Sequence, residues 1–515
     1  MQLRKLHLTE SGIKDIYWPI KYSDYEKISN KIKKIFLDSE NFFFKNKIQD
    51  FEIFSCLQIY IKQKLFILYH EKKIKNLINK YDNKTQKLLF SLETKGSFEH
   101  LHLQKGLKKK NKLIRYLRLL KNFYPKKVFS YRRLEKIKKK ELNIVVSNNP
   151  LIKEYLNNQK KTFYLVPLYE WFYKKTEKEF NSNKKKKLNL NLINFFLNKV
   201  EKEFIKLECR LTKKELNDFK KWILEYFFWV NLYLTRLDKV KDKLPKLLLT
   251  GSLGIIWCRI LAAAVKKNGG KVFNFDHSVG DFSINTSTSL FAESNSSDIF
   301  FTFNKKHINY YFKFMKYSKS SHSKLKLKSL LLSKKKNTIK KIEKKREGKK
   351  ILFVSPPFLL NQGLCITFFP PPILIDWHIR ILGALKKLGY QVIYKPHPDC
   401  NKEIVKRILS LVKIEIENEP FEAICYKYDY LFFDYRSTNT WRHAIKTDLP
   451  IILNDVDFYK LTKKDTLILK KRVSLLKINI DKKNKPNFSE KNLKNAIINS
   501  YKLRKDKTFH KLIFS

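Results

Sequence analysis

Two short polar segments in the last third of the chain have residue types suited to binding phosphate. The first is Lys395-Pro396-His397-Pro398, which follows an apolar stretch ending at Tyr394. Proline fixes its own backbone φ angle, so the two prolines preset the direction of the His397 imidazole. An imidazole and an ammonium together suit a diphosphate or a nucleotide monophosphate leaving group. The alternative interpretation is a rigid surface turn with an incidental histidine.

The second segment is Asp434-Tyr435-Arg436-Ser437-Thr438-Asn439-Thr440, which follows another apolar stretch and opens a short helix. Hydroxyl groups and backbone N–H groups at a helix N-terminus form an anion-binding site. Arg436, Ser437 and Thr438 are therefore candidate phosphate-binding residues. The alternative is an ordinary Ser/Thr helix cap.

The elements around these segments alternate between strand and helix. Apolar strands are predicted at 350–355, 390–394, 430–434 and 450–453, with helices at 376–388, 403–412 and 440–447. This alternation is typical of a doubly wound parallel sheet, in which ligands bind beyond the carboxyl ends of the strands. Both segments should therefore emerge at the same edge of one sheet.

A second α/β unit is predicted upstream. Strand 246–250, helix 255–267 and strand 271–275 imply a parallel pair with a right-handed crossover, and further strands are predicted at 142–147, 162–167 and 298–303. Two aromatic-rich helices are predicted within 186–243. The fold class is therefore α/β, with two Rossmann-like doubly wound domains and an N-terminal mainly helical region.

Changes in composition predict the domain boundaries. We expect a helical region at 1–125, a Rossmann-like acceptor-side domain at 126–317, a basic Ser/Lys-rich linker at 318–349, and a Rossmann-like nucleotide-donor domain at 350–515. The result would be a two-lobed molecule with a cleft.

The first Rossmann-like domain offers a candidate general base. Asp276 and His277 lie just past the strand that ends at Phe275, on the edge expected to face the cleft. A carboxylate or an imidazole there could deprotonate an acceptor hydroxyl. The alternative is a buried histidine bonded to backbone.

A third polar group follows three consecutive prolines and comprises Asp376, His378 and Arg380. On a helix, residues 376 and 380 share a face and residue 378 does not. This pattern is typical of a helix start, and a contribution to the cleft is the alternative. No metal-binding constellation is found.

A strand ending in Lys-Pro-His-Pro and a later Asp-Tyr-x-Ser-Thr segment before a short helix resemble the C-terminal half of GT-B-type, double-Rossmann glycosyltransferases. The resemblance covers Lys350 to Leu453. It points to the CDP-glycerol glycerophosphotransferases and the bacterial sialyl-, polysialyl- and capsule-polysaccharide transferases. Arg436 stands where the glycerophosphotransferases usually have Ser, and Ser278 and Val279 separate His277 from Gly280 where many of these families have His-Gly.

The resemblance implies a function. His397, Ser437 and Thr438 would hold the donor phosphate, and Glu422 would contact the nucleotide ribose or base. The reaction would move a sugar or a polyol phosphate from a nucleotide-activated donor, such as a CDP- or CMP-linked one, to a surface polysaccharide or lipid-linked acceptor. No cofactor is expected, and no metal is required if Lys395, His397 and the following helix end stabilise the leaving phosphate.

The charge of the chain suggests a rival function. Lys and Arg number 109 against 48 acidic residues, a formal net charge of +61. Such an excess favours a phosphate-bearing partner, either nucleic acid or an anionic membrane surface. Lysines are nevertheless spread along the whole chain, which is the pattern that drift under an AT-rich codon supply would produce. A non-catalytic nucleic-acid-binding protein is the rival class, but no zinc finger, RRM signature or localised basic helix supports it.

The remaining composition bears on cellular location. The six cysteines are scattered without a C-x-x-C pair, which favours a reducing compartment over a zinc site or a disulfide framework. The first residues carry no apolar signal-peptide core, and no apolar run reaches membrane-spanning length. We therefore expect a cytoplasmic protein, with a peripheral position on the inner face of the cell membrane as an option.

Overall fold

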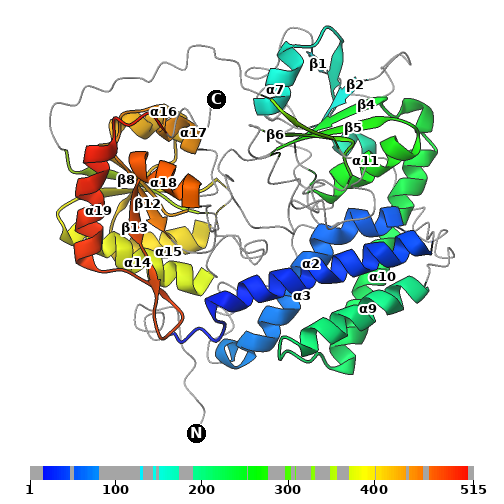
Figure 1. Ribbon diagram of the computed structural model, residues 1–515, viewed down its shortest axis with the longest axis horizontal. Coiled ribbons are helices and arrows are strands. Elements are labelled where there is room, and N and C mark those ends of the chain that lie inside the picture. The colour runs from blue at the N-terminus through cyan, green and yellow to red at the C-terminus, as the bar shows by residue number, and fades with distance from the viewer. Residues whose placement is uncertain are drawn as a thin grey trace.

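The computed structural model describes residues 16–46, 51–79, 128–130, 143–146, 150–166, 168–172, 190–251, 253, 255–276, 296–302, 308, 326–330, 348–356, 371–398, 400, 402–435, 440–455 and 463–508. These residues form two separate parallel β-sheets, a layer of long helices and a small hairpin (Figure 1). The α/β class and the division into two sheets agree with the sequence prediction.

The C-terminal sheet has six strands in the order β10-β9-β8-β11-β12-β13, and every neighbouring pair is parallel. The strands are β8 (Lys350–Val354), β9 (Gln391–Lys395), β10 (Glu415–Ile416), β11 (Tyr430–Phe433), β12 (Ile451–Asp455) and β13 (Ser474–Lys477). Counted from β8, this order is the 3-2-1-4-5-6 arrangement of the Rossmann fold.

Helices connect and cover these strands. They are α14 (Pro371–Lys387), α15 (Lys402–Val412), α16 (Phe421–Ile424), α17 (Trp441–Ala444), α18 (Lys463–Arg472) and α19 (Glu490–Leu503). Successive residues of β8 join different cores, because Ile351 and Phe353 belong to one buried cluster while Leu352 and Val354 belong to another. Neighbouring side chains in a strand point to opposite faces, so the sheet is covered on both faces.

The N-terminal sheet has seven strands in the order β1-β3-β2-β4-β5-β6-β7, again all parallel. They are β1 (Val128–Ser130), β2 (Asn143–Val145), β3 (Phe163–Leu165), β4 (Leu247–Thr250), β5 (Lys271–Phe275), β6 (Ile299–Thr302) and β7 (Lys326–Ser329). Leu248 and Leu249 belong to different buried clusters, so this sheet is also doubly wound. Helix α7 (Pro150–Asn157) places Tyr155 against Phe273, Phe275 and Phe301.

Strand β7 corrects the predicted linker. Residues 326–329 lie within the segment 318–349, yet they pair with β6 and form the edge of the first sheet. Lys326 is exposed, and the strand alternates lysine with less polar residues. Lysine-rich edge strands discourage pairing with other chains. Over these four residues, the lysine-rich composition therefore belongs to an edge strand and not to a linker.

The helical layer is built from two stretches of sequence. Helices α2 (Tyr22–Lys45) and α3 (Phe51–Ile78) pack against α9 (Leu190–Ile205) and α10 (Lys213–Asp238), at the lower right of Figure 1. Helix α10 begins with a capping box in which Thr212 and Glu215 bond to each other's backbone N–H groups. Both α3 and α10 contact α11 (Ile256–Lys267), which connects β4 to β5. The layer is therefore attached to the N-terminal sheet.

His70 makes the helical layer sensitive to acid. Its side chain is buried between the rings of Trp18, Tyr25 and Tyr69, and this burial lowers its pKa to about 3. The unfolded chain binds a proton near pH 6.5 while the folded chain does not, so stability falls as the pH drops below that value. Between about pH 7.5 and about pH 5 we expect His70 to cost about 2 kcal/mol. In urea unfolding at both pH values, the free energy of unfolding should change less with pH in His70→Gln than in the wild-type protein. An equal change in the two proteins would contradict this expectation.

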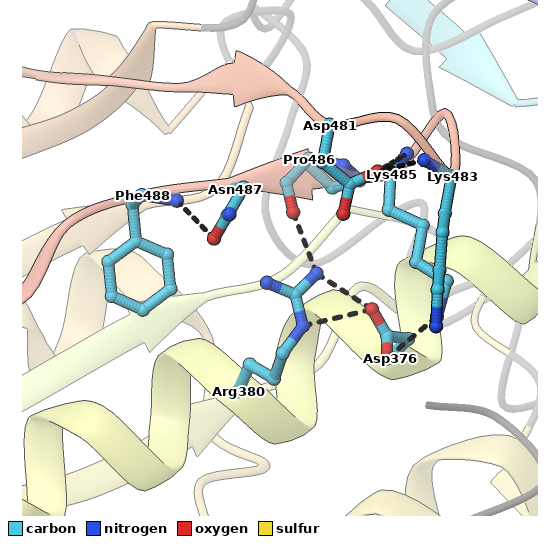
Figure 2. Close-up of polar contacts among 8 residues, drawn as sticks. All are labelled: Asp376, Arg380, Asp481, Lys483, Lys485, Pro486, Asn487 and Phe488. Atoms are coloured by element: carbon cyan, nitrogen blue, oxygen red, sulfur yellow. Dashed lines mark hydrogen bonds and ion pairs between the residues drawn. The ribbon is translucent and has the colours of Figure 1, made fainter. Parts of the chain in front are cut away.

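A small antiparallel hairpin, β14 (Asn479–Ile480) and β15 (Pro486–Asn487), connects the last sheet strand to α19. Arg380 of α14 contacts the Asp376 carboxylate with two nitrogens and donates to the carbonyl of Pro486 (Figure 2). The ammonium of Lys485 lies 3.3 Å from the other Asp376 oxygen, and both side chains are buried. Asp376 and Arg380 thus share a face of α14, as their spacing predicted, and attach the hairpin to it.

The same hairpin contacts the N-terminal segment. The backbone N–H of Trp18 donates to the carbonyl of Lys483 at 3.0 Å, and the Asn484 amide donates to the carbonyl of Trp18 at 2.7 Å. Asn484 has a φ of 57°, in the left-handed region that asparagine tolerates. The indole of Trp18 in turn donates to the hydroxyl of Tyr25 on α2. The hairpin therefore joins the C-terminal domain to the helical layer.

Candidate functional site

The carboxyl edge of the C-terminal sheet contains a topological switch point. The chain runs from β8 to β9 on one side and later returns to β11 on the other side, so β9 and β11 both flank β8. Ligands of open α/β sheets bind at such a point. Next-adjacent strands lie roughly 10 Å apart, so a phosphate-linked molecule can reach both exits.

Backbone hydrogen bonds hold the three strand exits at one level. The N–H of Ser355, directly after β8, donates to the carbonyl of Lys395 at 3.0 Å. The N–H of Asp434, directly after β11, donates to the carbonyl of Val354 at 3.1 Å. Strands β9 and β11, which lead into the two candidate segments, therefore end at the same edge of the sheet, as the strand pattern predicted.

Lys395 and His397 lie on the β9 side of this edge. Lys395 is the last residue of β9 and is 9% exposed, whereas His397 is half-buried. Burial lowers the pKa of Lys395, and the carboxylates of Glu417 and Glu422 partly oppose this effect. The carbonyl of His397 accepts the N–H of Cys400 at 3.0 Å, which closes the turn. Lys395 and His397 thus lie two residues apart at the exit of β9, next to the switch point.

Acidic residues border the same side. Glu422 is exposed on α16, and its carboxylate lies 3.4 Å from His443 of α17. Glu417, which the sequence analysis did not single out, follows β10 and accepts hydrogen bonds from the N–H of Glu419 and from the hydroxyl of Tyr428. These bonds lower the pKa of Glu417. Glu417 and Glu422 can therefore accept hydrogen bonds from ligand hydroxyl groups near Lys395.

The predicted phosphate-binding residues Arg436, Ser437 and Thr438 lie outside the described residues, so their role remains a prediction. The residues on either side are placed. Tyr435 is buried directly after Asp434, and the carbonyl of Thr440 accepts the N–H groups of His443 and Ala444 at the start of α17. The segment therefore connects the exit of β11 to a helix start.

The N-terminal domain has two candidate bases, Asp276 and His277, and the structure describes only Asp276. Asp276 directly follows β5, is 6% exposed, and donates its backbone N–H to the carbonyl of Phe301 at 2.8 Å. It lies at the carboxyl edge of its sheet, one strand away from the switch point between β2 and β4. His277 lies outside the described residues. The assignment of either residue as a base remains a prediction.

The described residues show neither a metal site nor a membrane-spanning helix. No group of three or more His, Cys, Asp or Glu residues in these ranges is arranged to hold a metal ion. Among the same residues, no helix is long and apolar enough to cross a membrane.

No protein-family model and no curated protein matches the chain. Two solved glycosyltransferase structures are similar to it, each at 10% identity and each covering 73% of this chain and 92% of the other. They are a glycosyltransferase from Rickettsia africae ESF-5, with a TM-score of 0.36, and CalG4, the calicheamicin glycosyltransferase, with a TM-score of 0.33. The fold class rests on the chain's own two parallel sheets, which define a double-Rossmann, GT-B-like layout with a helical region.

Proposed function

We propose that this protein is a glycosyltransferase that uses a nucleotide-activated donor. One observation carries the proposal: the exit of β9, where the Lys395–Pro398 turn begins, and the exit of β11 at Asp434 flank β8 at the switch point of the C-terminal sheet. The sequence that follows each exit has residue types that bind phosphate, and the position is where open α/β sheets bind nucleotides.

The reaction we propose divides the roles between the domains. A base in the N-terminal domain, Asp276 or His277, takes the proton of an acceptor hydroxyl, and the oxygen then attacks the sugar carbon of the donor, or its phosphorus when a polyol phosphate is transferred. The bond from the attacked atom to the oxygen of the leaving phosphate breaks, and the nucleotide leaves with the electron pair. Lys395 and His397, with Ser437 and Thr438, would stabilise the negative charge that develops on the phosphate.

The finer assignments belong to the same proposal. A sugar or a polyol phosphate would be transferred to a surface polysaccharide or lipid-linked acceptor, without a metal. A phosphate beside Lys395 would favour its ammonium form and so oppose the effect of burial on its pKa.

A thermal-shift screen of CMP, CDP, UDP and GDP tests donor binding. A nucleotide present at about 100 times its dissociation constant should stabilise the folded protein by roughly 2.7 kcal/mol. Tripolyphosphate is the matched control, since a merely basic surface would bind it as well as a nucleotide. Failure of all four nucleotides to shift the unfolding transition would contradict the proposal.

The net charge of +61 supports a peripheral position on an anionic membrane. Well-placed lysines contribute about 1 kcal/mol each near such a surface, and salt screens this attraction. We expect sedimentation with anionic liposomes at low salt and release at high salt. Equal binding to neutral liposomes would refute electrostatic attachment. RNA binding that collapses in salt and is blind to sequence would indicate the rival nucleic-acid-binding class.

A further inference from the structure

A buried polar network lies directly beneath the switch point. Its centre is the carboxylate of Asp434, the first residue after β11. One carboxylate oxygen accepts the indole N–H of Trp377 at 2.7 Å and the side-chain amide of Asn454. The other lies 2.7 Å from Nε2 of His378. The side chains of His378 and Asp434 are 0% and 2% exposed, so water does not compete for these bonds.

The network continues from the other imidazole nitrogen. Nδ1 of His378 lies 3.1 Å from the hydroxyl of Tyr394, which donates to Oγ of Ser355 at 2.7 Å. Ser355 in turn donates to the carbonyl of Pro356 at 2.8 Å. Burial raises the pKa of Tyr394 well above its ordinary value, so the hydroxyl keeps its proton as a hydrogen-bond donor.

The members of this network come from the ends of four neighbouring strands. Ser355 directly follows β8, Tyr394 lies near the end of β9, Asp434 directly follows β11, and Asn454 lies near the end of β12. Trp377 and His378 extend from α14, and the Arg380 guanidinium lies over the Trp377 ring. The network therefore connects the exits of β9 and β11, where the two candidate phosphate-binding turns begin.

Burying polar and ionisable groups has a cost that apolar residues at these strand ends would avoid. A hydrogen-bonded network instead fixes directions, because each hydrogen bond constrains an angle as well as a distance. The two carboxylate oxygens of Asp434 have enough acceptor sites for the Trp377 indole, the Asn454 amide and the His378 imidazole together, so three side chains hold this one group. Catalytic groups need such support to stay in productive geometry.

We propose that Asp434 is a positioning residue, held by Trp377, His378 and Asn454, which fixes the exit of β11 relative to Lys395 and His397 for binding of the donor phosphate. This inference rests on the proposed function. The network touches no ligand atom itself. The network fixes the direction in which the chain leaves β11. Its member Tyr394 does the same for the exit of β9.

The test uses single substitutions in the full-length protein. Tyr394→Phe removes one oxygen and keeps the stacked ring, and His378→Leu removes the donor to Asp434. The nucleotide that gives the largest shift among CMP, CDP, UDP and GDP is titrated by calorimetry at 25 °C, far below unfolding. We expect its dissociation constant to rise about 10–100-fold in both variants, the scale of a small misplacement of binding groups. His378→Gln, which keeps a side-chain amide donor, should recover part of the loss.

Ser500→Ala is the matched control, because Ser500 is buried on α19, outside the network, and donates to the carbonyl of Ile497 in its own helix. It should lower the melting temperature without changing nucleotide affinity. If the network had a purely structural role, Tyr394→Phe and His378→Leu would resemble Ser500→Ala and leave the nucleotide affinity unchanged. If the wild-type protein binds a nucleotide and both Tyr394→Phe and His378→Leu bind it with unchanged affinity, the inference about Asp434 is wrong and the proposed function stands. A wild-type protein that binds none of the four nucleotides overturns the proposed function as well.

Discussion

Replacement of His397 by alanine should lower turnover by roughly 10²–10³-fold, the scale of losing one preorganised donor to a developing negative charge. His397 follows β9 by two residues, is half-buried, and stands on the same turn as Lys395. Transfer from the activated form of the nucleotide found in the screen is the measurement. The effect should appear mainly in kcat, because the imidazole acts on charge that appears during the reaction.

The same substitution should leave the fold intact, since the side chain lies on a turn outside both buried clusters. Cys400→Ala is a suitable control on this turn, because the Cys400 N–H that donates to the carbonyl of His397 is kept. Unchanged turnover in His397→Ala would remove His397 from the active site. A loss of equal size in Cys400→Ala would show that the turn, and not the imidazole, matters.

A second large effect is expected on stability, from Arg259 of α11. Its guanidinium is fully buried and donates to the carbonyl of Leu253, after β4, and to the carbonyl of Ser55 on α3 at 2.7 Å. Arg259→Met keeps most of the volume but removes both donors. The Ser55 carbonyl lies inside α3 and keeps its intrahelical bond, whereas the Leu253 carbonyl loses its side-chain donor, so we expect a loss of roughly 1–3 kcal/mol.

Urea unfolding followed by intrinsic fluorescence measures this loss. Because the chain has more than one domain, the free energy belongs to the transition in which the N-terminal sheet and helical layer unfold. Arg210→Met, at an exposed position, should change stability by less than about 0.5 kcal/mol. Equal midpoints for the two variants would show that Arg259 does not hold α11 to α3.

The alternation of apolar strands and helices predicted most of both sheets, because strands buried on two faces are continuously apolar. Two edge strands were not predicted, for the opposite reason. β7 alternates lysine with less polar residues, and β10 is only two exposed residues, so neither has the composition of a buried strand. Helix α14 begins at Pro371, before the predicted Asp376, because proline fits the first turn of a helix.

The candidate site was predictable only where it follows a strand directly. Lys395 and Asp434 could be placed at one sheet edge from strand order alone. The partner of His378 could not, because Asp434 is 56 residues further along the chain and only the packing of α14 on the sheet brings them together. The spacing argument did separate His378 from Asp376 and Arg380, which is the division that the structure has.

The contact between the hairpin and the N-terminal segment bears on the order of events during synthesis. Trp18 leaves the ribosome early, but Asn484, which donates to its carbonyl, follows 466 residues later. Until then the indole and the first turn of α2 lack part of their native surroundings, and such non-local contacts form slowly. Asn484 must therefore be synthesised before the segment around Trp18 can take its final place, so this contact forms long after the segment itself has been made.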